Sequence, residues 1–302
     1  MLIVTLVATL AAGMVWRQQQ AVAVEAAERA RAQGAWILDA GIDWARLVLR
    51  EDARTGNVDH LGEPWATPLA EARLSTFLAA DRENHDDTGL DAFLSGAIVD
   101  AQSRYNLRNL VDAEGRVAET ELRTLQRLCD SAGVPSDTAM RIALNLQAAI
   151  AAADGGDDAA DAPLVPDRVA DLRWFGLDAE TLARLEPYVS LLPNPTPLNV
   201  NTAAREELAA VIEGLDLASA ERIVQARAQS PLRAVADLEA LLPEGVAAGT
   251  TNRVGVSSGY FEVRARLRLD DRVVEERALV RRRGPETAVL WRERRSLQLP
   301  PA

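Results

Sequence analysis

The carboxylates best placed to do chemistry in this sequence are four aspartates in one short acidic segment. Asp154, Asp157, Asp158 and Asp161 lie within eight residues, and two glycines follow the first of them. Calcium takes six to eight oxygen ligands in flexible geometry, and glycines allow the chain to turn tightly around an ion. The segment lacks the spacing of an EF-hand loop, however. The residues alone therefore leave two interpretations open, a calcium site and a solvated acidic linker.

No other part of the sequence has the pattern of a catalytic centre. His60 and His85 are the only histidines and have no metal-hydrolase motif around them, and Cys129 is the only cysteine. A single cysteine forms no intrachain disulfide and no thiolate zinc site. Nucleophile-elbow, phosphate-loop and dinucleotide motifs are absent from the sequence. We therefore predict a protein that is not an enzyme, with no catalytic residues and no organic cofactor.

Composition narrows the class further. The chain has 302 residues, of which 48% are hydrophobic, so it can hold two modest cores. Its net charge of −12 argues against a phosphate backbone as ligand, because such ligands need a clustered basic surface. The same charge suits hard cations.

The first residues form an apolar segment. From Met1 to Trp16 there is no charged residue, and Arg17 ends the run. A helix needs about 20 apolar residues to span a bilayer, so the segment is a few residues short. It is therefore either a cleaved signal or a span whose beginning is missing, and no basic residues open it as they open a secretory signal. We expect a membrane anchor over residues 1–19.

One long helix is expected to continue from this anchor. Residues 16–50 contain no proline and only two glycines, and apolar side chains recur at roughly helical intervals. The predicted helix runs from residue 2 to about residue 53, and a glycine and a pre-proline position in the stretch 57–66 stop it. Its amphipathic second half should pack on a soluble domain.

Strands are predicted on both sides of a long helical region. Residues 71–79 and 90–100 are expected to be short strands, joined by a polar loop over 81–89. From residue 251 the pattern alternates between a buried apolar face and a basic, wet face that includes Glu262. Residues 270–271 should then turn the chain into strands over 272–282 and 287–297. On the last strand, Val289 and Trp291 are expected to share a face.

The region between the strands has a helical pattern. Residues 120–132 and 137–153 are expected to form an antiparallel helix pair, with Ser136 as an N-cap and Cys129 packed between the helices. Two further short helices are expected over 166–192. Residues 199–242 then have the layout of a helix-hairpin-helix unit, a fold that often binds DNA through backbone amides.

The charges of this hairpin unit argue against DNA. Asp216 stands where the hairpin needs its second glycine, so a carboxylate lies where a phosphate should approach. Seven acidic residues outnumber four arginines across 199–242. Because an acidic surface repels the phosphate backbone, we predict that the unit packs within the protein and binds no nucleic acid.

Together these elements predict an α+β fold. A long helix with two strands, a helical region and three further strands make one α+β domain with an all-α domain grafted into it. The expected division is the anchor over 1–19, the first part of the sheet domain over 20–110, the inserted α-helical domain over 111–250 and the C-terminal strands over 251–302.

Three stretches carry a resemblance to a known family. They are Asp-His-Leu-Gly-Glu-Pro-Trp-Ala at 59–66, the stretch 100–110 with its Asn-Leu-Arg-Asn-Leu ending, and Asn-Val-Asn-Thr-Ala at 199–203. With the long apolar first helix, they resemble the minor pseudopilin K family of type II secretion over most of the chain. The resemblance implies a pilin-like domain, in which the long helix packs on a small antiparallel sheet and the helical domain is inserted between strands. It also implies calcium at the acidic loop of that helical domain.

The resemblance further implies a function. It indicates a structural subunit at the tip of a periplasmic pseudopilus, which initiates assembly with the minor pseudopilins I and J for protein export. One helix would hold it in the bacterial inner membrane, with the bulk of the chain in the periplasm. The alternative is a membrane-tethered periplasmic scaffold or binding module, whose helix-hairpin-helix-like unit binds a partner protein.

Overall fold

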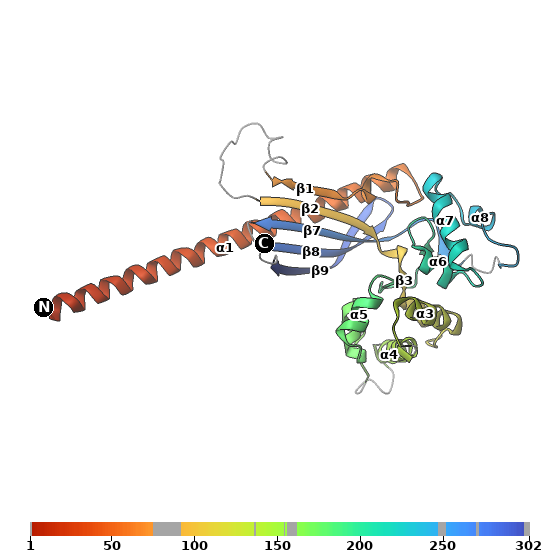
Figure 1. The fold of residues 1–302 in the computed structure, drawn as a ribbon, viewed down its shortest axis with the longest axis horizontal. Helices are drawn as coiled ribbons and strands as arrows, with labels where there is room; N and C mark the ends of the chain where they lie inside the picture. Colours follow the sequence, from red (N-terminus) through yellow and green to blue (C-terminus); the bar gives the residue numbers. More distant parts are fainter. Residues whose placement is uncertain are drawn as a thin grey trace.

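The computed structural model describes residues 2–74, 92–135, 137–153, 155, 162–246, 252–269 and 272–298. Figure 1 shows three parts along the long axis of the molecule: a projecting helix, a sheet packed on the second half of that helix, and a group of short helices at the far end of the sheet. The described part therefore has the α+β architecture that the sequence predicts.

The projecting element is α1, Leu2–Thr55, one continuous helix as predicted. Its second half buries a stripe of apolar side chains at helical spacing, namely Leu38, Ile42, Ala45 and Leu49. Glycines lie in the same contact: a Cβ at Gly41 would stand 3.3 Å from the Cβ of Ala265 in the sheet. The helix backbone can therefore approach the strands closely.

The sheet is antiparallel throughout, in the order β1-β2-β7-β8-β9. Its strands are β1 (Leu69–Arg73), β2 (Ala92–Asp100), β7 (Tyr260–Leu269), β8 (Arg272–Arg283) and β9 (Glu286–Gln298). β2 pairs directly with β7, although the whole helical region lies between them in sequence. The helical domain is therefore an insertion between neighbouring strands. Alternate apolar residues of β7 pack against the buried stripe of α1 and form the first core.

The insertion surrounds a second core with short elements. In chain order these are η2 (Ala101–Ser103), β3 (Tyr105–Asn106), η3 (Leu107–Leu110), α3 (Glu119–Ala132), α4 (Asp137–Ala153), η4 (Val169–Phe175), α5 (Ala179–Leu185), β4 (Val189–Ser190), β5 (Leu198–Asn199), α6 (Arg205–Val211), α7 (Leu217–Gln229), α8 (Val235–Glu239) and β6 (Val254–Gly255). A further short helix, η1 (Pro64–Ala66), follows α1. Two parallel pairs, β3 with β4 and β5 with β6, hold distant parts of this region together.

The predicted helix pair is present as α3 and α4. Cys129 is fully buried in the second core, and burial raises the pKa of its thiol to about 12. The proposed cap at Ser136 lies outside the described residues. Of the two short helices predicted over 166–192, α5 is an α-helix and η4 is a 3₁₀ helix.

The first predicted strand is shorter than expected. β1 ends at Arg73, whereas the pattern indicated a strand over 71–79. Residues 75–79, the predicted loop over 81–89 and the start of the next strand lie outside the described residues. The same holds for the predicted turn at residues 270–271.

β9 contains a bulge that the alternating pattern did not indicate. Val280 pairs with Val289, but Leu279 pairs with Trp291, so Leu290 is an extra residue in β9. Val289 therefore packs in the core beneath α1, whereas Trp291 packs with Leu279 on the opposite face of the sheet. The expectation that Val289 and Trp291 share a face is wrong, because the bulge reverses the alternation between them.

The face of the sheet away from α1 is only partly exposed to solvent. Glu262 was expected on the wet face, yet only 5% of it is exposed, and Arg104 of the insertion pairs with it. Further along the same strand Arg266 is exposed. The insertion therefore covers one end of the outer face and leaves the other end in solvent.

Candidate functional site

Five buried polar residues meet where the insertion joins the sheet. We call them the junction hub: Asp59 from the loop after α1, Asp100 at the end of β2, Asn199 and Thr202 from the insertion, and Ser258 just before β7. Each keeps 8% or less of its surface exposed. Buried polar groups cost free energy unless they are hydrogen-bonded, so their pairing shows how the two domains are joined.

The carboxylate of Asp100 is the centre of the junction hub. Its Oδ2 accepts hydrogen bonds from the hydroxyls of Ser258 and Thr202, both at 2.6 Å, and from Asn199 Nδ2 at 3.0 Å. Its Oδ1 accepts from the backbone N–H of Gln102 at 2.7 Å. Burial raises the pKa of Asp100, and these hydrogen bonds oppose the rise. Losing one donor leaves a buried acceptor short of a partner, so the hub resists distortion.

Asp59 ties the junction hub to α1 and β8. Its carboxylate accepts from the backbone N–H of Ser258 at 2.7 Å and pairs with Arg282. Arg282 also pairs with Asp52, near the end of α1, at 2.6 Å, and its guanidinium lies 4.6 Å from the centre of the Phe261 ring. The projecting helix, the sheet and the insertion are thereby joined through one set of buried charges.

Asp52, Asp59 and Glu63 form the one group among the described residues whose carboxylates lie close enough to share a metal ion, with oxygens within 4.8 Å of one another. Burial raises the pKa of Asp52 and of Glu63. Glu63 accepts from the backbone N–H of His60 and from Trp65 Nε1, both at 2.8 Å. The guanidinium of Arg282 pairs with two of the three carboxylates, those of Asp52 and Asp59, so these residues form a structural ion-pair cluster.

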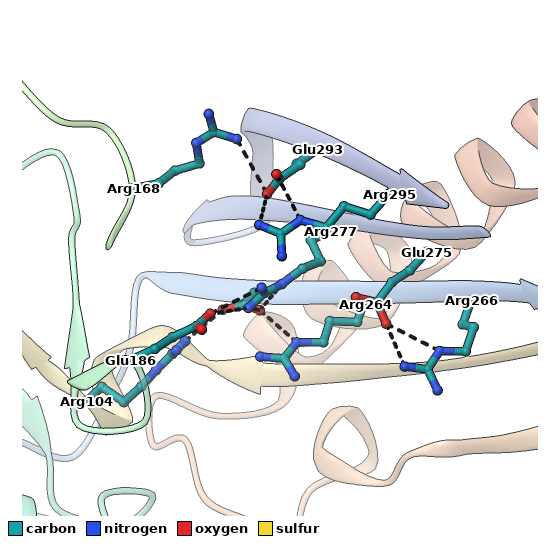
Figure 2. Close-up of polar contacts among 10 residues, drawn as sticks. Arg104, Arg168, Glu186, Arg264, Arg266, Glu275, Arg277, Glu293 and Arg295 are labelled. Atoms are coloured by element: carbon teal, nitrogen blue, oxygen red, sulfur yellow. Dashed lines mark hydrogen bonds and ion pairs between the residues drawn. The ribbon is translucent and has the colours of Figure 1, made fainter. Parts of the chain in front are cut away.

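A second contact between the domains lies on the outer face of the sheet (Figure 2). Glu262 of β7 is bound by Arg104 of the insertion at 2.8 Å, by Arg264 at 2.7 Å and by Arg277 of β8 at 2.7 Å. Burial by itself would raise the pKa of Glu262, but the three arginines lower it to about 2. Arg277 also reaches Glu186 of the insertion at 3.2 Å. This network fixes the insertion from the side opposite α1.

The network continues to β9 and leaves a cavity. Arg168 of the insertion lies 3.5 Å from Glu293, and its guanidinium lies 5.9 Å from the centre of the Trp291 ring. Arg295 pairs with the same Glu293 at 2.9 Å. These residues and the surroundings of Glu262 line a cavity of about 60 Å³ between the insertion and the sheet.

The surface of α1 is the other distinctive feature. Among the described residues it is the one helix long and apolar enough to cross a membrane, and its apolar residues from Leu2 to Trp16 are exposed. Beyond the anchor, Trp36, Trp44 and Leu47 are 76%, 53% and 49% exposed. They recur at helical spacing on the side opposite the buried stripe. Between residues 36 and 47 the helix is therefore apolar on two faces, and the sheet covers only one.

The four aspartates singled out as calcium ligands, Asp154, Asp157, Asp158 and Asp161, all lie outside the described residues. Asp216, which was interpreted as a charge that repels phosphate, caps α7. Its carboxylate accepts from the backbone N–H of Ser219 at 2.8 Å and from the hydroxyl of the same residue at 3.1 Å. The backbone hydrogen bond lowers the pKa of Asp216. The negative charge at this position therefore serves to cap the N-terminus of α7.

Sequence reasoning did not identify the junction hub. Four of its residues, Asp59, Asp100, Asn199 and Thr202, lie in the stretches that carry the family resemblance. The available signal was a set of small polar residues between apolar neighbours, as in Leu198-Asn199-Val200. This pattern indicates a buried polar side chain, but it does not say which distant residue pairs with it.

Family models and related sequences from two bacteria match this chain, and all of them carry the same description. Residues 103–194 and 198–257 each match a family model described as type II secretion system (T2SS), protein K. Type II secretion system protein K of Pseudomonas aeruginosa is 31% identical over 295 residues, which covers 90% of this chain and 83% of that protein. The protein of the same name from Pectobacterium carotovorum subsp. carotovorum is 26% identical over 324 residues, covering 97% and 93%.

The fold is also similar to that of a solved protein. A chain in the crystal structure of the GspK-GspI-GspJ complex from the enterotoxigenic Escherichia coli type 2 secretion system matches with a TM-score of 0.68. The match covers 89% of this chain and 98% of that one at 21% sequence identity. The likeness supports the arrangement of long helix, antiparallel sheet and inserted helical domain.

Proposed function

From the premise that this chain belongs to the type II secretion system protein K family and is a minor pseudopilin, we propose that it stands at the tip of a periplasmic pseudopilus. There it initiates assembly together with the minor pseudopilins I and J. A single helix holds it in the inner membrane before assembly, with the sheet and the insertion in the periplasm. Its role is structural and it performs no catalysis.

The observation that carries this proposal is the double apolar face of α1. Leu38 and Ile42 lie beneath the sheet, whereas Trp36 and Trp44 are exposed on the opposite side. Large exposed apolar patches mark interaction sites, and tryptophan is the residue type most often found at the energetic centre of an interface. The uncovered face suits the apolar helix of another pseudopilin that lies alongside.

The position of the insertion supports a place at the tip. Figure 1 shows the helical domain at the end of the sheet opposite to the projecting N-terminal part of α1. The junction hub and the Glu262 network fix the domain from two sides. The domain occupies the end of the subunit that lies farthest from the membrane. A rigid domain at this end suits the first subunit of a filament, because no further subunit has to pack above it.

The test is capture of the partners by the full-length chain from cells that produce I and J. The double variant Trp36→Ala/Trp44→Ala should lose about 2 kcal/mol or more of binding, roughly thirtyfold in capture. Trp174→Ala is the matched control, because Trp174 is 44% exposed but lies on the insertion. Undiminished capture by the double variant, with an unchanged melting curve, would overturn this role for α1.

We also propose that the acidic segment containing Asp154, Asp157, Asp158 and Asp161 binds calcium. Four carboxylates within eight residues repel one another unless a cation or solvent screens them. The resemblance to the pseudopilin K family supports calcium over a solvated linker.

A further inference from the structure

The cavity between the insertion and the outer face of the sheet is lined from both domains. Arg104, Arg168 and Glu186 belong to the insertion, and Glu262, Arg277 and Trp291 belong to the sheet. Figure 2 shows the charged members of this set converging from the two sides. Glu186 and Arg295, at its rim, keep 48% and 45% of their side-chain surface exposed, so the cavity opens to solvent there.

The lining carries an excess of positive charge. Four arginines and three glutamates line the cavity, which leaves one net positive charge. Each of the glutamates is already engaged: Glu186 and Glu262 accept from Arg277, and Glu293 accepts from Arg295. No free carboxylate of the lining is thus left for a cation. Arg168 also lies 3.6 Å from Asp171, outside the lining, so an anion would be held by the N–H groups of paired arginines rather than by an unpaired charge.

The lining also contains two hydrogen-bond donors without acceptors. Arg104 Nε and Trp291 Nε1 are buried, and neither has a hydrogen-bond partner in the described part of the chain. A buried donor without an acceptor costs free energy, which an incoming acceptor recovers. Both residues line the same cavity, so both unpaired donors belong to its walls.

We propose that this cavity binds a carboxylate group. The volume of about 60 Å³ corresponds to a few water molecules, which is the size of a carboxylate with its adjoining carbon. Glu262 shows that the surroundings suit this chemistry, because three arginines already hold its carboxylate at 2.7–2.8 Å. Since neighbouring side chains cover both free nitrogens, binding involves a rotation of Arg104 or Trp291. The site does not depend on the proposed position at the tip.

Two sources could supply the carboxylate: a free small organic acid, or an acidic side chain of a protein that assembles with this one. The indole N–H of Trp291 reports on either. Full-length protein labelled with ¹⁵N-tryptophan in detergent gives at most six indole signals, and Trp291→Phe assigns the relevant one. The probes are sodium acetate and the peptide acetyl-Gly-Glu-Gly-amide, each matched with sodium chloride at constant ionic strength.

Acetate should shift the Trp291 indole signal saturably and leave that of Trp174 unchanged. Arg104→Lys keeps a positive charge beside Glu262 but lacks the Nε donor, and it should weaken acetate binding about tenfold. Arg264→Lys is the matched control, because Arg264 also binds Glu262 but does not line the cavity; it should leave binding unchanged.

The peptide identifies the source. Tighter binding of the glutamate peptide than of acetate, lost in the corresponding glutamine peptide, indicates an acidic side chain of a partner. Equal binding of the two probes indicates a free organic acid. A Trp291 signal that moves no further with acetate or the peptide than with chloride would show that the cavity holds only water. A signal that responds equally in Arg104→Lys would show that acetate acts without the Arg104 donor. Either result overturns the proposal.

Discussion

The side-chain amide of Asn199 donates a hydrogen bond of 3.0 Å to the carboxylate of Asp100, joining the inserted domain to the last residue of β2. Both side chains are buried, with exposures of 0% and 2%. The same amide also reaches the backbone carbonyl of Asp59 at 3.1 Å. A neutral donor is essential at this place, because Asp100 already brings a buried negative charge.

Asn199→Asp should therefore destabilise the protein more than Asn199→Ala. The aspartate puts a second carboxylate against Asp100 and removes the donor, and an uncompensated buried charge costs about 3–5 kcal/mol. The melting temperature, followed by circular dichroism at pH 7, should fall most in Asn199→Asp. Asn194→Asp, at an exposed position of the same domain, serves as the control and should change little. Equal melting of Asn199→Asp and wild type would show that the hub does not join the domains.

The ion pairs of Arg282 predict that substitutions at this residue lower the free energy of unfolding by different amounts. Arg282→Met leaves Asp52, Asp59 and Glu63 crowded without their cation, so at pH 7 the free energy of unfolding should fall by about 3–5 kcal/mol. Arg282→Lys keeps the charge but not the two-sided guanidinium geometry, so it should lie between Arg282→Met and wild type. Arg283→Met changes the next, exposed residue and should be close to wild type.

Lowering the pH should reduce the difference in stability between Arg282→Met and wild type. Burial already raises the pKa of Asp52 and of Glu63. Arg282 opposes the rise at Asp52, so without Arg282 the Asp52 carboxyl protonates at a still higher pH, which relieves the repulsion. Melting curves between pH 7 and pH 4 measure the effect. A loss in Arg282→Met that stays constant across this range would mean that packing against Phe261, rather than charge, explains it.

How far the sequence predicts this structure depends on the kind of signal. The long helix, the helix pair around Cys129 and the insertion between strands follow from apolar periodicity, because that period records which side chains are buried. The bulge at Leu290 has no such signature. One extra residue reverses the alternation, and the sequence 287–297 looks equally regular with or without it.

The junction hub and the burial of Glu262 escaped prediction for a related reason. Glu262 alternates with apolar neighbours and so looks like a solvent-facing residue, and only the placement of Arg104 by the insertion shows that it is covered. Asp100 and Asn199 lie 99 residues apart in sequence. Local sequence patterns do not indicate which distant residues pair. Polar contacts between the domains can therefore be identified only from the three-dimensional structure.

The acidic segment gives a prediction that depends on the sequence alone. An ion that binds only the folded state raises stability with its saturation. Calcium at a hundred times its dissociation constant should therefore add about 2.7 kcal/mol, and melting in calcium should exceed melting in chelator. Asp157→Ala with Asp158→Ala should remove the difference, whereas Asp130→Ala, an exposed acid on α3, should keep it. Equal melting of wild type in both conditions would identify a solvated linker.

Glu207 of α6 gives the protein a pH dependence of its own. It is 3% exposed, and its Oε2 has no hydrogen-bond partner among the described residues. Burial is the main cause that raises its pKa from 4.5 to about 7, and Glu206 adds repulsion, while Arg104 and Arg227 oppose the shift. The folded protein therefore holds this proton more tightly than the unfolded chain does.

Stability should consequently fall as the pH rises through this window. Below about pH 4.5 both states are protonated and Glu207 costs nothing, whereas above pH 7 the folded state carries a buried charge that costs on the order of 3 kcal/mol. Glu207→Gln imitates the protonated form, so it should melt higher than wild type at pH 8 and together with it near pH 4.5. Glu206→Gln removes only the smaller repulsion that the adjacent carboxylate adds and loses the pair with Arg205, so its gain at pH 8 should be clearly smaller. If Glu207→Gln melts no higher than wild type at pH 8, the buried carboxylate is stabilised by a contact other than those described.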